Sequence, residues 1–321
     1  NIDDNLGRLF DTLDKLKIAD NTLVIFMTDN GPQQVRYVAG MRGRKGSVYR
    51  GGIRVPFYLR YPKIAKKGAD IEVMAAHIDV LPTLAEVCGL QVPQDRKIDG
   101  QSMFPFITDT SKSEEDRPFF SYWTRRYPEK YQNISLQKGN YTLVGNGNYN
   151  DTLEAFELFD LKKDPYELNN VVLEHKNIAE ALMSELNAQY TELISSENIT
   201  DSPRIHVGTE HENPVTLNRN DAGGERGIWD QEEVYGKWAV KLEAGTYNIK
   251  FKFVKPLEEK GNMVVETGAI IHQFENDRTG SDMLEMKNVV LPAMTCDVIP
   301  FYTSKTKRIF PFFMEMERIV N

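Results

Sequence analysis

The sequence predicts an α/β region, then a small α+β region, then an all-β region. Three observations predict this order. A helical apolar pattern at residues 2–16 precedes a short apolar run at residues 22–28, short strands surround one long helical pattern after residue 108, and strand patterns without a helix follow residue 200. We therefore expect part of an α/β domain at residues 1–108, an α+β subdomain at residues 109–200 and a β-sandwich at residues 201–321.

Composition limits the class of protein. The chain has 321 residues with 40% hydrophobic and 27% charged residues, which is typical of a folded globular protein. Lysine and arginine total 39 against 47 acidic residues, and the net charge of -8 argues against a general nucleic-acid binder. No apolar run approaches the roughly 20 residues that span a bilayer, so we expect no membrane span.

The first region contains two helical patterns and two strand patterns. One amphipathic helix carries its apolar face on Ile2, Leu6, Leu9, Phe10, Leu13 and Leu16. The run from Thr22 to Thr28 predicts a strand buried on both faces of a parallel sheet, and a second strand is expected after Ile53. The sequence DVLPTLAEVCG predicts a helix with Asp79 at the N-cap.

The other two regions consist mainly of short strands. In the α+β region we expect strands at Phe119–Trp123, on both sides of a turn near Gly139 and at FELFDL, followed by a helix with Ile178, Leu182, Leu186, Tyr190 and Leu193 on one face. In the last region we expect strands on both sides of Ala244-Gly245 and at Met263–Thr267, Val289–Leu291 and Arg308–Val320, with Trp238 in the core.

Asp29 and Asn30 are the first candidate site residues because they follow the apolar strand. Ligands of open α/β sheets bind beyond the carboxyl ends of strands. A carboxylate and an amide carbonyl are hard oxygen ligands suited to calcium or magnesium. The alternative is a simple turn, because Asp, Asn and Gly all tolerate turn conformations.

Lys45 is the second candidate, in a glycine-rich stretch. Gly43 and Gly46 flank it and Gly51-Gly52 follows, so the backbone can approach a bound oxyanion closely while the lysine supplies positive charge. The alternative is a solvated basic loop that also holds Arg42, Arg44 and Arg50.

Five segments, in this order, resemble the C-terminal half of the sulfatase family within the alkaline-phosphatase superfamily. They are NTLVIFMTDNG, GRKGSVYRGGIRVPF, AAHIDVLPTLAEVCG, DGQSMFPFI and FELFDLKKDPYELNNV. The resemblance covers roughly residues 1–195. It implies that Asp29 and Asn30 ligate an active-site Ca²⁺ or Mg²⁺, and that Lys45 is a catalytic lysine that stabilises charge on the sulfate ester.

The resemblance also implies two substrate-side candidates and one missing part. His77 is such a candidate, and its alternative is a histidine with satisfied hydrogen bonds near a helix start. Arg50 departs from relatives that carry glutamate before Gly-Gly. Sulfatases use a formylglycine nucleophile made within Cys/Ser-x-Pro-x-Arg, and neither Cys88 nor Cys296 nor any serine here begins that signature. We therefore expect an upstream sulfatase segment to supply it, and expect this chain alone to be inactive.

The expected function is hydrolysis of a sulfated small molecule or glycan by a periplasmic or secreted enzyme, as the resemblance implies. A phosphatase or phosphonate-ester hydrolase of the same superfamily is one alternative. A non-catalytic carbohydrate-binding fragment and a structural remnant are the others. Trp229 is a third substrate-side candidate, because an aromatic ring can stack on a sugar in the last region.

Overall fold

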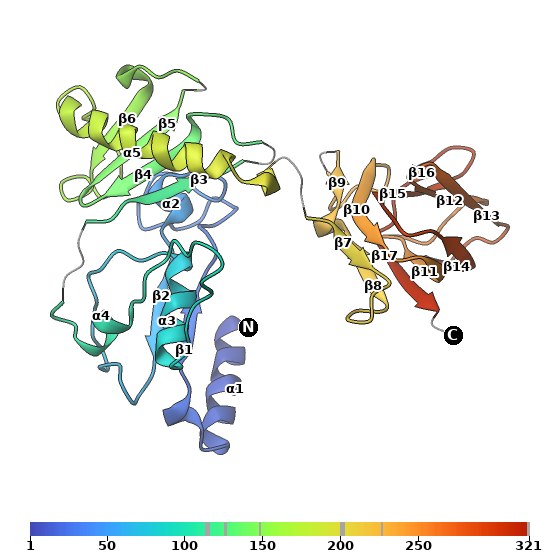
Figure 1. Ribbon diagram of the computed structural model, residues 1–321, viewed down its shortest axis with the longest axis horizontal. Coiled ribbons are helices and arrows are strands. Elements are labelled where there is room, and N and C mark those ends of the chain that lie inside the picture. Colours follow the sequence, from blue (N-terminus) through green and yellow to red (C-terminus); the bar gives the residue numbers. More distant parts are fainter. Residues whose placement is uncertain (113–115, 125–126, 148, 200–202, 226, 320–321) are drawn as a thin grey trace. The chain divides into compact units, whose positions relative to one another are not determined.

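The structure is a computed structural model that describes residues 1–112, 116–124, 127–147, 149–199, 203–225 and 227–319. The chain divides into two compact units, residues 1–196 and residues 197–321 (Figure 1). Each unit contains its own hydrophobic core. The regions expected at residues 1–108 and 109–200 therefore share the first unit, as far as residue 196. Among the described residues, no helix is both long and apolar enough to cross a membrane.

The first unit begins with helix α1 (Ile2–Lys15) and a two-stranded sheet. Strand β1 (Val24–Met27) pairs with β2 (Phe57–Arg60) in antiparallel register, and all four β1 residues are only partly buried. The expectation of a parallel strand buried on both faces is therefore wrong for the described part of the chain. An apolar run indicates that a strand can be covered on both faces, but it carries no information about the direction of its neighbour.

Short helices belong to this part of the unit: α2 (Arg50–Ile53) lies between β1 and β2 in the sequence, and α3 (Val80–Val87) and α4 (Phe104–Thr108) follow β2. Asp79 is the N-cap residue of α3, as expected, but its side chain does not cap that helix. The buried carboxylate instead accepts hydrogen bonds from the backbone N–H groups of Ala76 (2.7 Å) and Gln101 (2.8 Å) and pairs with Arg117. Asp79 therefore fastens neighbouring loops onto the start of α3.

An antiparallel sheet and one long helix complete the first unit. The sheet order is β3 (Phe119–Tyr122), β4 (Gln132–Lys138), β5 (Tyr141–Asn146) and β6 (Phe156–Asp160). Helix α5 (Lys176–Ile194) packs its buried residues Leu182, Leu186 and Tyr190 into the same core as Leu136 and Leu158 (Figure 1). These strands and the helix lie where the apolar patterns predict them.

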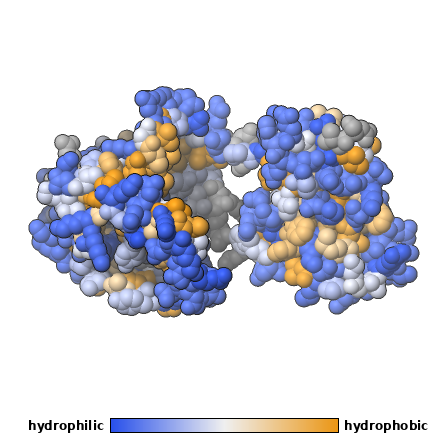
Figure 2. Space-filling view, turned by 90° about the horizontal axis from the view of Figure 1, so that it is seen from below, coloured by the Kyte–Doolittle hydropathy of each residue, from blue (hydrophilic) through white to orange (hydrophobic). Residues whose placement is uncertain are grey.

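Apolar side chains remain on the surface of the first unit. Helix α1 buries none of its residues, and the exposed large hydrophobic residues include Ile2, Leu9, Leu16, Phe57, Tyr58, Ile78, Leu81 and Leu90. Figure 2 displays apolar patches, in orange, among the polar surface of this unit on the left of the view. Exposed apolar surface of this extent is typical of a face that another polypeptide covers.

The second unit consists of two sheets around one core. The first sheet follows the order β13 (Ile270–Asn276), β12 (Gly261–Thr267), β15 (Met294–Thr303), β10 (Gly236–Leu242) and β7 (Ile205–Val207), with β16 (Arg308–Ile309) and β9 (Gly223–Gly224) paired at its sides. The second follows β14 (Met283–Leu291), β11 (Gly245–Lys252), β17 (Phe313–Ile319) and β8 (Val215–Asn218). Residues 243–244 thus connect β10 to β11 across the two sheets.

The core of the second unit contains Trp238, as the alternation of β10 predicts. Its ring is fully buried and stacks on Phe310 with 4.8 Å between ring centroids. Its indole Nε1–H donates to the backbone oxygen of Asn218 at 2.6 Å, so the polar edge is satisfied inside the core. Trp238 therefore ties the end of β8 to the β10 layer.

Replacing this buried tryptophan tests the core assignment. We expect Trp238→Ala to lower the free energy of unfolding of the second unit by about 3–5 kcal/mol, because it opens a cavity and removes a buried hydrogen bond. Trp229→Ala serves as the matched control, since Trp229 is exposed and surface substitutions usually stay within about 0.5 kcal/mol. Urea unfolding followed by fluorescence gives both values, and equal effects would contradict the assignment.

Candidate active site

Three glycines let two loops of the first unit meet backbone to backbone. The Gly31 N–H donates to the oxygen of Gly52 at 2.8 Å, and a Cβ at Gly31 would lie 1.9 Å from the oxygen of Gly51. A Cβ on Gly52 would lie 2.1 Å from the oxygen of Ser47. We call these contacts of Gly31, Gly51 and Gly52 the glycine seam. No side chain larger than hydrogen fits there.

The glycine seam holds the turn after β1 beside residues 42–50, which we call the lysine loop. Asp29 and Asn30 form that turn, with Asp29 exposed and Asn30 partly buried. The Lys45 backbone N–H donates to the oxygen of Pro32 at 3.1 Å, and its side chain is exposed. The structure therefore places the backbone of the turn beside the backbone of the lysine loop, whereas the Lys45 side chain is not among the residues that line the cleft around Asp29 and Asn30. The roles of Asp29, Asn30 and Lys45 stay predictions.

Side chains from the β4–β6 sheet hold the lysine loop from the opposite side. Asn133 accepts a hydrogen bond from the Val48 N–H (3.2 Å) and donates to the oxygen of Gly46 (2.9 Å). Glu157 accepts from the Arg42 guanidinium at 2.8 Å and from the Tyr49 hydroxyl. The loop is thus fixed at both ends by groups that are distant in sequence.

Arg50 and Glu167 form a further contact that holds the lysine loop. The fully buried Glu167 accepts from the Arg50 backbone N–H at 2.7 Å, while the Arg50 side chain donates to the oxygen of Pro165 at 3.1 Å. Burial raises the pKa of the Glu167 carboxyl to about 7, although the Arg50 N–H and the charges of Arg50 and Arg42 oppose that shift. Asp164 adds a smaller effect that raises it.

His77 contacts the end of strand β1. Its Nε2 lies 3.0 Å from the backbone oxygen of Thr28, which precedes Asp29. This hydrogen bond fits the alternative of a satisfied histidine near a helix start, and it also places His77 at the candidate site. Asp29, Asn30, Arg50 and His77 line one open cleft of about 2220 Å³ within the first unit.

Trp229 lies in the second unit, where its side chain is 49% exposed. The residues of the cleft lie in the first unit. Its candidacy as a substrate-side residue of the same site therefore stays a prediction.

The donor chemistry at the turn fits a hard divalent cation in part. Asp29 supplies carboxylate oxygens, and Asn30 directs its Nδ2 to the oxygen of Gly31 at 2.9 Å, which leaves its Oδ1 as an acceptor. Calcium takes six to eight oxygen ligands. In the described residues, no group of three or more His, Cys, Asp or Glu side chains gathers for a metal. The oxygens of Asp29 and Asn30 are thus fewer than the ligands that such an ion needs.

The sequence analysis missed the residues that support the loop. Glu157 and Glu167 both lie within FELFDLKKDPYELNNV, a segment quoted for its resemblance without a role for either acid. The sequence does not indicate the role of Asn133, because that role depends on a left-handed backbone conformation (φ 53°) that only the fold reveals.

Substitution in the glycine seam tests whether it is required. We expect Gly31→Ala to destabilise the first unit by several kcal/mol, roughly 3 or more, because its Cβ would overlap the Gly51 oxygen. Gly7→Ala in α1 is the control, since nothing lies within 4 Å and alanine favours a helix by about 1 kcal/mol. Chemical unfolding measures both, and a neutral Gly31→Ala would contradict the seam.

Glu167 provides a pH-dependent test. Because the pKa of about 7 exceeds the ordinary 4.5, the folded state holds a proton that the unfolded state loses between these values. Stability contributed by the protonated acid is complete below pH 4.5 and falls as pH rises to 7, by roughly 3 kcal/mol.

We therefore expect the stability of Glu167→Gln, relative to the natural chain, to increase between pH 4.5 and 7.5 and then level off. Urea unfolding across that range measures the difference. Glu174→Gln, on an exposed side chain, is the control substitution. A flat profile for Glu167→Gln would contradict the buried, protonated acid.

Part of the first unit is similar to a known protein family. Residues 44–195 match the family model described as N-sulphoglucosamine sulphohydrolase, C-terminal. That match includes Lys45, Glu157 and Glu167, whereas Asp29 and Asn30 precede it.

Curated relatives are sulfatases. An N-acetylglucosamine-6-O-sulfatase of Bacteroides thetaiotaomicron is 30% identical over 53% of this chain and 30% of its own length. The human arylsulfatase A is 31% identical over 53% of this chain and 37% of its own length. The chain thus spans about a third of the length of these relatives.

A solved structure shows the same fold. The protein named Ps i-CgsB is 24% identical, with 59% of this chain and 40% of that chain covered and a TM-score of 0.52. The family model and the curated relatives confirm the resemblance stated from the five sequence segments. Residues 44–195 are therefore similar to the C-terminal region of sulfatases.

Proposed function

We propose that the chain is the C-terminal part of a sulfatase that hydrolyses sulfate esters of carbohydrates or aryl alcohols. The observation that carries this proposal is the glycine seam, which sets the Asp29–Asn30 turn beside the Lys45 loop. An anionic ester needs positive charge beside a closely approaching backbone. The backbone contacts of the seam and the basic residues Lys45 and Arg50 of the adjoining loop support this proposal.

The residues have distinct roles in this proposal. Asp29 and Asn30 hold a Ca²⁺ or Mg²⁺ ion, which when bound polarises the sulfate oxygens. Lys45 stabilises the negative charge that grows on the oxygen of the departing alcohol as the bond from that oxygen to sulfur breaks. Glu157 and Glu167 are positioning residues, because they fix the backbone that carries Lys45.

An upstream segment with the formylglycine nucleophile completes the enzyme in this proposal. Two observations support it. The relatives are about three times as long as the matched region, and the first unit carries exposed apolar residues on α1, β2 and α3.

A sulfated glycan is the favoured substrate class. One relative is named for action on the 6-O-sulfate of N-acetylglucosamine, and the matched family model is named for a sulphoglucosamine. We place the enzyme in the periplasm or outside the cell, where polymeric sulfated glycans occur.

Activity of the chain with its upstream segment tests the proposal. We expect the 321-residue chain alone to be inactive on 4-nitrocatechol sulfate and N-acetylglucosamine 6-sulfate. Co-expression with the upstream segment of its own gene should give EDTA-sensitive sulfate release. Lys45→Ala should then lower kcat about 10²–10³-fold, the usual effect of removing one charge-stabilising group.

Two controls make this assay decisive. Lys15→Ala removes an exposed lysine of α1 and should leave kcat unchanged. The 4-nitrophenyl esters of phosphate and phenylphosphonate test the other hydrolases of the superfamily. Turnover by the chain alone, or faster cleavage of the phosphorus esters, would overturn the proposal.

A further inference from the structure

Loops from both sheets gather at one end of the second unit. Phe313 at the start of β17 pairs with Asn218 at the end of β8 and with Lys252 at the end of β11. The loops 219–235 and 304–312 meet there, because the Phe310 N–H donates to the oxygen of Glu232 at 3.0 Å. We call this end of the unit the aromatic end, for the side chains described below.

Arg219 fastens these loops to each other. It is 3% exposed and donates to four backbone oxygens, those of Ile228 (3.0 Å), Gln231 (2.7 Å), Phe310 (2.6 Å) and Pro311 (3.1 Å). A buried guanidinium whose donors all serve backbone carbonyls keeps both loops in one conformation. The aromatic end is therefore ordered before any ligand arrives.

Three large aromatic side chains remain exposed on these loops. Trp229 is 49% exposed, Phe312 46% and Tyr235 41%. Trp229 follows Ile228, which accepts from Arg219, and the Phe312 ring lies 6.0 Å from the Arg219 guanidinium carbon. Tyr235 is held by its backbone N–H, which donates to Glu225 at 3.0 Å. Fixed aromatic rings match the flat, apolar faces of pyranose sugars.

Carboxylates are frequent in the loop that carries Trp229 and Tyr235. The described residues of the 219–235 loop include five acidic residues: Asp221, Glu225, Asp230, Glu232 and Glu233. The guanidinium of Arg219, in the same loop, is buried. Carboxylates accept hydrogen bonds from sugar hydroxyl groups and repel sulfate groups. The charge therefore favours an unsulfated glycan over a sulfated one.

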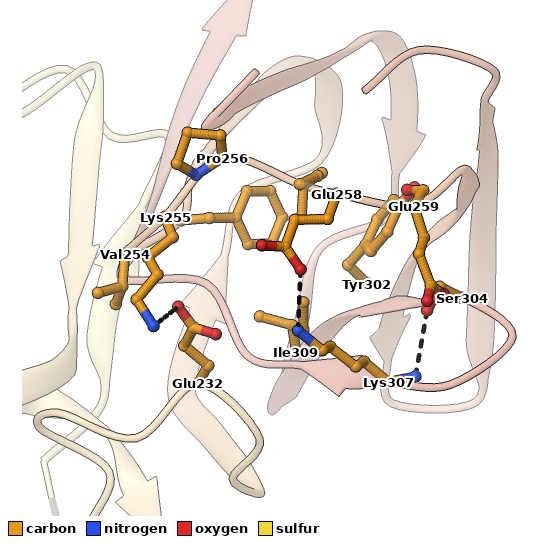
Figure 3. Close-up of a pocket in the computed structure, with 12 residues that line it drawn as sticks. Glu232, Val254, Lys255, Pro256, Glu258, Glu259, Tyr302, Ser304, Lys307 and Ile309 are labelled. Carbon is orange, nitrogen blue, oxygen red and sulfur yellow. Dashed lines mark hydrogen bonds and ion pairs between the residues drawn. The ribbon is translucent and has the colours of Figure 1, made fainter. Parts of the chain in front are cut away.

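The neighbouring pocket does not hold the sugar. Figure 3 shows its mouth crossed by two ion pairs, Lys255 with Glu232 and Lys307 with Glu258, each at 3.3 Å. Its volume of about 50 Å³ is far below the roughly 300 Å³ at which ligand pockets begin. A sugar chain would thus lie on the open aromatic surface.

We propose that the aromatic end of the second unit binds unsulfated pyranose residues of a glycan, with Trp229, Tyr235 and Phe312 as stacking surfaces. This site takes sugar that carries no sulfate, which is a different ligand from the ester of the proposed hydrolase. The proposed sugar site lies wholly within the second unit and needs no metal. A test of this site is therefore independent of the hydrolase site proposed in the first unit.

Calorimetry of the 321-residue chain in EDTA tests the proposal. The probes are neutral hexasaccharides of glucose, galactose, mannose, xylose and N-acetylglucosamine, each beside its sulfated form. We expect binding of at least one neutral probe, with its sulfated form weaker by about fivefold or more at low salt and a smaller gap at high salt. Trp229→Ala should weaken binding about tenfold, a typical loss for an aromatic anchor.

Phe274→Ala is the matched control, since Phe274 is 41% exposed on β13 and belongs to no loop of the aromatic end. It should bind as the natural chain does, and circular dichroism checks that both variants fold. Failure to bind every neutral probe, preference for sulfated probes or an unchanged Trp229→Ala would overturn the proposal. Sedimentation velocity that reveals a dimer lost in Trp229→Ala would also overturn it, because a second copy would then occupy the surface.

Discussion

The backbone contact at the glycine seam is the constraint on which the candidate active site depends. Gly31 meets Gly51 and Gly52 so closely that a Cβ at Gly31 would lie 1.9 Å from a backbone oxygen. This approach lets the turn after β1 and the lysine loop share hydrogen bonds, including Lys45 N–H to Pro32 at 3.1 Å. The glycines near Lys45 therefore serve two needs: Gly43 and Gly46 adopt positive φ angles, and the seam glycines permit contact.

The rest of the first unit supports that seam from one side and leaves the other side open. The β3–β6 sheet provides Asn133 and Glu157, and the loop after β6 provides Glu167. Val48 of the lysine loop also shares a small buried cluster with Val144 and Phe159 of that sheet. In contrast, α1 buries no residue. The contrast fits our proposal that the described unit supplies the supported half of a sulfatase site and that another segment covers the open half.

Sequence patterns predicted the elements whose apolar residues face one core. Helix α5, the β4–β5 hairpin and the buried Trp238 are examples, because regular spacing alone determines which side chains turn inward. The direction of β2 relative to β1 and the division of strand 308–320 into β16 and β17 depend on distant partners and were not predictable. In the site, residue chemistry identified Asp29, Asn30 and Lys45, whereas Asn133, Glu157 and Glu167 act through contacts that only the fold creates.

Paramagnetic broadening by Mn²⁺ would test the central claim that a cation-binding turn lies beside the lysine loop. Amide spectra of the deuterated 321-residue chain would be recorded during a Mn²⁺ titration, with Ca²⁺ as competitor. The account predicts selective loss of the Gly31, Gly46 and Gly52 signals, reversal by Ca²⁺ and no such loss in Asp29→Asn. Broadening that spares these amides, or that persists unchanged in Asp29→Asn, would contradict the account.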